Sequence, residues 1–167
     1  MYKVIIADDE VWIGFGIKKL IHRSGLPFEV VGEAPNGIKA YEMVKELKPD
    51  LLITDIRMPG LSGLELMKKL MEEGHTLKVV FISGYAEFEY AKDALRMGAF
   101  DYLLKPVEEE KLFRVLDQAV EKLTQQEKKT LLLETREGTR CIPLDRILYA
   151  ERAGRVMRCH CTDGVLD

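Results

Sequence analysis

The sequence predicts an α/β fold in which five parallel strands alternate with five helices, a doubly wound (βα)5 arrangement. Two observations support this prediction. Short runs rich in apolar residues recur five times in the first 124 positions, and each is followed by apolar residues at helical spacing. The runs are nearly continuously apolar, which is typical of a parallel sheet that helices cover on both faces.

The five expected strands are separated by turn signals and by proline. Gly25-Leu26-Pro27 precedes the second strand, and Asn36-Gly37 follows it. Pro49 precedes the third strand because proline cannot continue the helix before it. The strands are expected at residues 3–8, 28–33, 51–54, 79–82 and 102–104.

Each strand is followed by a stripe of apolar residues three or four positions apart, the spacing of one helix face. Ser62 and Glu65 predict a capping box at the start of the third helix. Gly98 is a typical residue just beyond the end of the fourth. The stripes are Ile13, Ile17, Leu20 and Ile21; Ala40, Val44 and Leu47; Leu64, Met67 and Met71; Ala91, Ala94 and Leu95; and Leu112, Leu116, Ala119 and Leu123.

The composition is that of a globular protein. The chain has 167 residues, of which 47% are hydrophobic and 32% are charged, and its net charge of −3 argues against bulk affinity for nucleic acid. No apolar run approaches the roughly 20 residues of a membrane span, and the N-terminus lacks the layout of a signal peptide. The three cysteines, all after residue 140, make no disulfide framework. We therefore expect a cytoplasmic protein with no membrane partner.

Polar side chains stand at the carboxyl ends of four expected strands. Asp8 and Asp9 follow the first strand, Asp55 the third, Ser83 the fourth and Lys105 the fifth. Open parallel sheets bind their ligands outside this edge. We therefore expect these five side chains to converge on one site.

Clustered carboxylates need a cation. Two carboxylates about 4 Å apart repel by roughly 4 kcal/mol at an effective dielectric of 20. Mg²⁺, which takes one or two carboxylates together with phosphate oxygens, is therefore the expected cofactor. Lys105 adds a positive charge, and Ser83 a hydroxyl, that suit phosphoryl oxygens. The chemistry that fits is transfer of a phosphoryl group onto an aspartate.

The segments IIADDE, LLITDIRMPG, FISGYAE and YLLKPV together resemble the receiver domain of two-component response regulators, which has the flavodoxin/CheY-like fold. The resemblance covers residues 2–124, so that 1–124 is the expected receiver domain, and it implies the strand order 2-1-3-4-5. It implies that Asp55 is the phosphoacceptor. It also implies that Asp8, Asp9, Asp55 and the backbone carbonyl of Arg57 hold Mg²⁺.

The same resemblance assigns phosphate binding to Lys105, switch roles to Ser83 and Tyr102, and a cis peptide to the bond before Pro106. It implies a sensor histidine kinase as phosphoryl donor. It further implies homodimerisation, on phosphorylation, through the fourth helix, the fifth strand and the fifth helix. We expect a phosphorelay signalling domain that phosphorylates and dephosphorylates itself, and not a turnover enzyme.

The alternative function is a Mg²⁺-dependent phosphatase with an aspartyl-phosphate intermediate. Such enzymes usually carry a second acid two residues after the nucleophile, where this chain has Arg57. Each motif taken singly also has a structural explanation, since acids often begin a helix and Ser83-Gly84 can form a helix-entry turn. Trp12 and Phe15 stay open between a docking surface for the kinase and partial packing in the core.

The last part of the chain differs in character. Residues 125–130 are polar and are expected to extend the last helix as a linker, and residues 131–167 are expected to form short strands. Cys159 and Cys161 alternate with polar residues on one such strand, without the spacing of a zinc site. Six arginines give the segment local positive charge: Arg136, Arg140, Arg146, Arg152, Arg155 and Arg158.

The stretch CIPLDRILYAERAGRV resembles the opening of a LytTR DNA-binding domain, a family of transcription regulators. Only the first part of such a domain is covered. We therefore expect residues 131–167 to be an N-terminal fragment of a LytTR-like domain with weak or no DNA binding of its own. DNA is then a partner of a full-length form only.

Overall fold

The computed structural model describes residues 1–84, 88–128, 130–135, 138–153, 156–162 and 164–166. Arg136 and Arg155, two of the arginines named above, lie outside the described residues. The chain divides into two compact units, Met1–Val120 and Glu121–Asp167. Among the described residues, no helix is both long and apolar enough to cross a membrane.

The first unit is built on a five-stranded parallel sheet with the order β2-β1-β3-β4-β5, as predicted. The strand β3 is buried from end to end and β4 is buried from its second residue onward, which explains their apolar sequences. The observed strands match the predicted ones to within a few residues at their ends. They are β1 (Tyr2–Ala7), β2 (Phe28–Ala34), β3 (Leu51–Asp55), β4 (Lys78–Ser83) and β5 (Asp101–Leu104).

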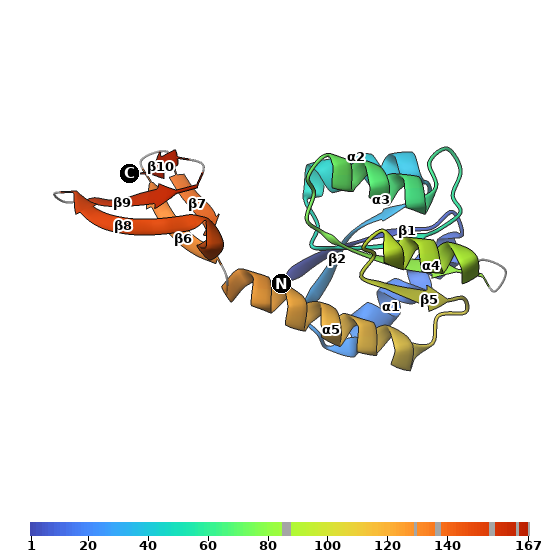
Figure 1. Ribbon diagram of the computed structural model, residues 1–167. Helices are drawn as coiled ribbons and strands as arrows, with labels where there is room; N and C mark the ends of the chain where they lie inside the picture. The colour runs from blue at the N-terminus through green and yellow to red at the C-terminus, as the bar shows by residue number, and fades with distance from the viewer. Residues whose placement is uncertain (85–87, 129, 136–137, 154–155, 163, 167) are drawn as a thin grey trace. The chain divides into compact units, whose positions relative to one another are not determined.

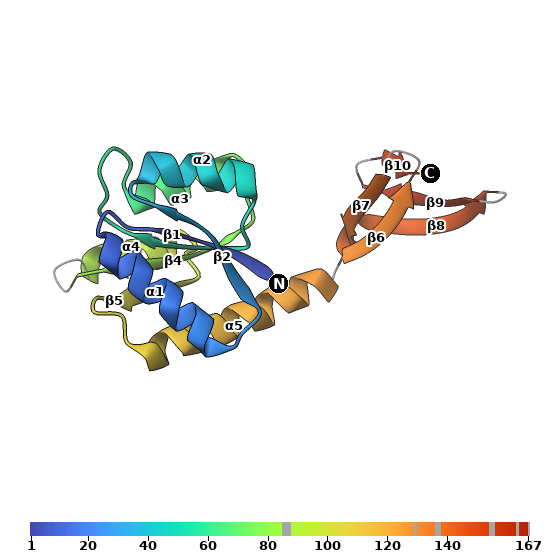
Figure 2. The same ribbon diagram turned by 180° about the vertical axis from the view of Figure 1, so that it is seen from behind.

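Helices cover both faces of this sheet. α1 (Val11–Ser24) and the first part of α5 (Glu109–Lys128) lie on one face, and α2 (Gly37–Leu47) and α3 (Gly63–Glu72) lie on the other (Figures 1 and 2). α4 (Phe88–Arg96) packs beside β5. The fold is therefore the flavodoxin/CheY-like one that the sequence predicted.

The helix boundaries follow the predicted signals. Ser62 and Glu65 form the capping box, in which each side chain accepts a hydrogen bond from the backbone of the other residue. Gly98 has the positive φ of 95° that favours glycine after a helix. The C-cap residue of α2 is Lys48, which takes a left-handed conformation immediately before Pro49.

A close approach at Gly63 shapes the loop after β3. A Cβ atom added to Gly63 would lie 2.1 Å from the backbone oxygen of Asp55, so no larger residue fits there without a shift of backbone. The Gly63 backbone N–H donates to the Ile56 oxygen at 2.8 Å. The start of α3 is therefore held against the strand end that carries Asp55.

The second unit contains short strands, as the sequence predicted for its last part, and these strands pair antiparallel. β6 (Thr130–Thr135) pairs with β7 (Gly138–Pro143), and a separate three-stranded sheet has the order β10-β9-β8. This sheet comprises β8 (Ile147–Ala153), β9 (Val156–Cys161) and β10 (Gly164–Leu166), preceded by a short 3₁₀ turn (Leu144–Arg146). Cys141, Cys159 and Cys161 are free thiols.

Candidate functional site

The carboxyl ends of β1, β3 and β5 bring acids and a lysine together. Asp55 is the last residue of β3, Asp8 follows β1 directly, and Lys105 follows β5. Carboxylate oxygens of Asp8, Asp9 and Asp55 all lie within 4.8 Å of one another. Asp8 and Asp55 are buried, at 5% and 6% exposure, whereas Asp9 is exposed to solvent. The cluster is thus open to solvent on the Asp9 side.

Lys105 is the cation of this cluster. Its Nζ lies 2.6 Å from Asp55 Oδ2, 3.0 Å from Asp8 Oδ2 and 3.1 Å from Glu10 Oε1. The lysine side chain is only 15% exposed, so these contacts lie in a poorly hydrated place where ion pairs are screened little. The Lys105 ammonium is therefore paired with three carboxylates, two of which follow β1 and one of which ends β3.

Two pKa shifts follow from this arrangement. Burial disfavours the charged form of Lys105, but its hydrogen bonds to Asp55 and Glu10, together with its ion pair with Asp8, outweigh burial and raise the pKa of Lys105 above its ordinary value of 10.5. Lys105 is therefore an ammonium at neutral pH. Burial raises the pKa of Asp8 above 3.8, although the Glu10 backbone and Lys105 act in the opposite direction. Burial thus makes the ionised form of Asp8 energetically unfavourable.

Asp55 is held from both sides of its carboxylate. The backbone N–H of Arg57 donates to Oδ1 at 3.1 Å, and Lys105 donates to Oδ2 at 2.6 Å. The Thr54 hydroxyl donates to the Asp55 backbone oxygen at 3.0 Å. Arg57 therefore touches the site through its backbone, while its exposed side chain lies over the ring of Tyr90, with Cζ 5.6 Å from the centroid.

Asp8 has an unsatisfied oxygen. Its Oδ1 accepts a hydrogen bond from the Glu10 backbone N–H at 2.8 Å. Its Oδ2 is buried and has no hydrogen-bond partner among the described residues, since the ammonium 3.0 Å away is not aligned as a donor. Three clustered carboxylates with one unsatisfied buried oxygen fit a divalent cation with oxygen preference.

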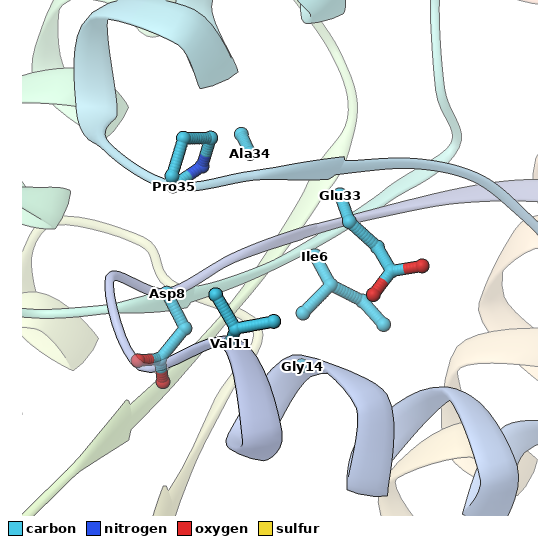
Figure 3. A pocket seen from close by; sticks show the side chains of 7 residues that line it. All are labelled: Ile6, Asp8, Val11, Gly14, Glu33, Ala34 and Pro35. Atoms are coloured by element: carbon cyan, nitrogen blue, oxygen red, sulfur yellow. The ribbon is translucent and has the colours of Figure 1, made fainter.

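A small pocket adjoins Asp8 on the side of α1. It has a volume of about 180 Å³ and is lined mainly by apolar side chains. In the view of Figure 3, the side chains of Val11 and Ile6 lie between those of Asp8 and Glu33. The pocket is lined by Ile6, Asp8, Val11, Gly14, Glu33, Ala34 and Pro35.

Ser83 and Tyr102 form a pair beside the acids. Ser83 is the fully buried last residue of β4, next to Ile82, which pairs in register with Asp55. The Ser83 hydroxyl donates to the Tyr102 hydroxyl oxygen at 2.9 Å. The backbone N–H of Lys105 donates to the Ser83 oxygen at 2.7 Å, and the bond between Lys105 and Pro106 is cis.

Sequence reasoning missed the role of Glu10 as a partner of Lys105 and the contact of Arg57 with Tyr90. Glu10 follows Asp8 and Asp9 directly, as the last residue of the segment IIADDE. Trp12 and Phe15 on α1 are 68% and 55% exposed, which argues against packing in the core, and their role as a docking surface stays a prediction.

A family model described as the response regulator receiver domain matches residues 4–117. The chain belongs to this family. Residues 4–117 are therefore the receiver domain of a two-component response regulator, a signalling domain of the fold described above. Its relatives include proteins named as transcriptional regulators.

Two curated relatives of this receiver illustrate the match. A Bacillus subtilis protein named uncharacterized transcriptional regulatory protein YesN is 39% identical over 127 residues, which make up 76% of this chain and 34% of YesN. The transcriptional regulatory protein HptR of Staphylococcus aureus is 35% identical over 127 residues, 76% of this chain and 50% of HptR. The chain thus spans half or less of the length of these relatives.

Solved receiver structures agree with the fold. The REC domain of AraT, a response regulator from Geobacillus stearothermophilus, superposes with a TM-score of 0.69 at 40% identity, covering 74% of this chain and 96% of that one. A DNA-binding response regulator of the LuxR family from Staphylococcus aureus gives a TM-score of 0.66 at 27% identity, covering 71% and 98%.

Proposed function

We propose that this receiver accepts a phosphoryl group on Asp55 from the phosphohistidine of a sensor histidine kinase in the cytoplasm. The observation that supports this most directly is the contact of 2.6 Å between Lys105 Nζ and Asp55 Oδ2 inside a cluster of three carboxylates. In the reaction, an Asp55 oxygen forms a bond to phosphorus. The P–N bond of the donor breaks, and the imidazole nitrogen keeps the electron pair.

Asp8, Asp9, Asp55 and the backbone carbonyl of Arg57 are the groups that would hold Mg²⁺. The unsatisfied Oδ2 of Asp8 supports this assignment. Mg²⁺, when bound, supplies positive charge for the phosphoryl oxygens. Lys105 supplies a second, fixed positive charge on the side of Asp55 away from Arg57 N–H. Positioning and charge then account for the chemistry, without a separate general base.

The proposed switch uses Ser83 and Tyr102. A phosphoryl group on Asp55 offers the Ser83 hydroxyl an anionic acceptor, and charge-assisted hydrogen bonds are roughly twice as strong as neutral ones. The hydrogen bond from Ser83 to Tyr102 would then be lost, and Tyr102 would move. We propose that this remodels the face of α4, β5 and α5 and favours a homodimer. Sedimentation with and without beryllofluoride tests this step, and an unchanged monomer would contradict it.

The output is proposed to be transcription. Both curated relatives reported above are named transcriptional regulatory proteins, and Glu121–Asp167 forms a separate compact unit that contains antiparallel strands. We propose that residues 131–167 are the start of a LytTR-like DNA-binding domain, so that a full-length form binds DNA. Sequence-specific DNA binding by the 167-residue chain alone, at physiological salt, would contradict the proposal that residues 131–167 bind DNA weakly or not at all by themselves.

One experiment decides between this function and an aspartyl-phosphate phosphatase. The full chain is incubated with acetyl phosphate and Mg²⁺, and its intact mass is measured. The receiver is expected to gain one phosphoryl group, and Asp55→Asn none. Chelation of Mg²⁺ should abolish the gain. Multiple turnover of a small phosphate ester would support the phosphatase instead.

A further inference from the structure

Glu10 connects the loop after β1 to the residue after β5. Its backbone N–H donates to Asp8 Oδ1 at 2.8 Å, and its side-chain Oε1 accepts from Lys105 Nζ at 3.1 Å. Glu10 is the N-cap residue of α1, yet its side chain makes no capping hydrogen bond. The Glu10 side chain therefore accepts a hydrogen bond from a lysine 95 positions away and does not cap its own helix.

The ammonium of Lys105 has three N–H donors, and their use is uneven. Aligned hydrogen bonds go to Asp55 Oδ2 and Glu10 Oε1. Asp8 Oδ2 is as near, at 3.0 Å, but receives no aligned hydrogen. The lysine side chain is 15% exposed, whereas Glu10 is 42% exposed. Because little solvent reaches Lys105, water cannot readily replace the carboxylates as partners of its ammonium group.

Phosphorylation of Asp55 requires that Asp55 Oδ2 give up its hydrogen bond with Lys105. The inference therefore rests on the proposed function. Asp55 Oδ1 is occupied by the Arg57 backbone N–H, which leaves Oδ2 as the oxygen free to attack once Lys105 releases it. A largely buried ammonium that loses an acceptor without a replacement is costly. Asp8 is committed to the proposed metal site. Among these three carboxylates, Glu10 is the one that keeps Lys105 paired during the attack.

We infer that Glu10 is a positioning residue for phosphorylation of Asp55. It holds the Lys105 ammonium beside Asp55 while Oδ2 forms its bond to phosphorus, and it leaves that ammonium in place for the new phosphoryl oxygens. Glu10 acts through Lys105 and not as a metal ligand. Loss of the Glu10 carboxylate therefore lowers the rate of Asp55 phosphorylation even at saturating Mg²⁺. A residue that acted only through the affinity for Mg²⁺ would have no effect at saturation.

The test measures the rate of phosphorylation of the full chain by acetyl phosphate, followed by intact mass over a series of Mg²⁺ concentrations. Glu10→Gln keeps the size of the side chain and removes its charge, and we expect about a tenfold lower rate at saturating Mg²⁺. Glu29→Gln is the charge-matched control. Glu29 lies on β2 opposite Lys3, at the start of the strand and far along the sheet from the site.

Two further variants separate positioning from a general effect of charge. Glu10→Asp restores the charge but is one methylene shorter, and we expect it to stay slow. Lys105→Met is expected to be slow, and Glu10→Gln is expected to cause no further loss in the Lys105→Met background, since Glu10 acts through that lysine.

The outcomes are distinct. A Glu10→Gln rate equal to wild type, full recovery in Glu10→Asp, recovery of Glu10→Gln at saturating Mg²⁺, or a further tenfold loss in the Lys105→Met background would each overturn the inference while leaving the proposed function in place. A wild type that takes no phosphoryl group overturns both.

Discussion

Ser83 and Tyr102 are joined by a hydrogen bond of 2.9 Å between their hydroxyl groups. Ser83 is fully buried at the end of β4, one residue beyond the register partner of Asp55. Tyr102 lies on the neighbouring strand, paired in register with Phe81, and is only partly buried. The hydrogen bond therefore links the edge of the acidic site to an aromatic ring that reaches toward the surface of β5.

Replacing Ser83 by alanine should cost about 1 kcal/mol of unfolding free energy, because the Tyr102 hydroxyl loses this partner. Urea unfolding followed by the helical circular dichroism signal measures the change. Tyr102→Phe removes the same bond from the other side, so the double variant should cost no more than the larger single one. Fully additive losses would mean that the two hydroxyls do not depend on each other.

Asp8→Asn should stabilise the protein at neutral pH in the presence of a chelator. Burial raises the pKa of Asp8, so the folded chain binds this proton more tightly than the unfolded chain does. Its unfavourable contribution is absent below the unfolded pKa near 3.8 and sets in as the pH rises through the higher folded value. The increase in the urea midpoint of Asp8→Asn over that of the wild type should therefore be largest near pH 7 and become smaller as the pH is lowered.

Mg²⁺ supplies the control for this prediction. If Asp8 helps to hold the ion, saturating Mg²⁺ stabilises the wild type by mass action and reverses the advantage of Asp8→Asn. A variant that is less stable than wild type in chelator would contradict the raised pKa.

The capping box of α3 should show the opposite dependence on pH. Hydrogen bonds from the Ser62 hydroxyl and backbone lower the pKa of Glu65 below 4.5. This contribution to stability is present above pH 4.5 and is lost as the pH falls through the folded value. Ser62→Ala should cost about 1 kcal/mol at neutral pH and less in acid. A cost that does not change with pH would show that Glu65 gains nothing from the cap.

The acidic site was predictable because its residues lie at strand ends. Asp8, Asp55, Ser83 and Lys105 are each the last residue of a strand or the one after it, and parallel strands end at a common edge whatever their side-chain conformations. The bond from Glu10 to Lys105 was not predictable in this way. It depends on how two flexible side chains lie across loops that are 95 positions apart.

Helix α1 shows a second limit. Its sequence carries two apolar stripes at helical spacing, one with Ile17 and Ile21 and one with Trp12 and Phe15. The structure buries Ile17 and Ile21 and exposes the other two. Spacing alone cannot choose between two such stripes, because the choice depends on which side of the helix meets the sheet.

Trp12→Ala should therefore change the unfolding free energy by less than about 0.5 kcal/mol, as is usual for a surface position. Ile17→Ala on the same helix is the matched control. Its side chain is 2% exposed, and its loss should cost about 2–5 kcal/mol. The rate of phosphorylation by acetyl phosphate should not change in Trp12→Ala. A large loss of stability in this variant would restore the core-packing interpretation and remove Trp12 from consideration as a docking residue.

The last prediction concerns Arg57, whose backbone touches Asp55 and whose guanidinium lies over the Tyr90 ring of α4. An exposed cation–π contact contributes about 0.5–1 kcal/mol, whereas a hydrogen bond to a charged group contributes about 1.5–3 kcal/mol. A phosphoryl group on Asp55 should therefore draw the guanidinium away from Tyr90 and loosen α4.

Hydrogen–deuterium exchange of residues 88–96 measures this loosening. At a protein concentration that keeps the chain monomeric, so that no dimer interface protects α4, beryllofluoride, which mimics the phosphoryl group, should speed exchange in α4 of the wild type. Tyr90→Ala should speed it without beryllofluoride and leave little further change on addition. Tyr41→Ala is the matched control, because Tyr41 also lies beneath lysine ammonium groups, those of Lys45 and Lys69, but on α2. Unaltered exchange of α4 in Tyr90→Ala would show that the ring contact does not hold this helix, and the signal would then have to leave the site by Ser83 and Tyr102 alone.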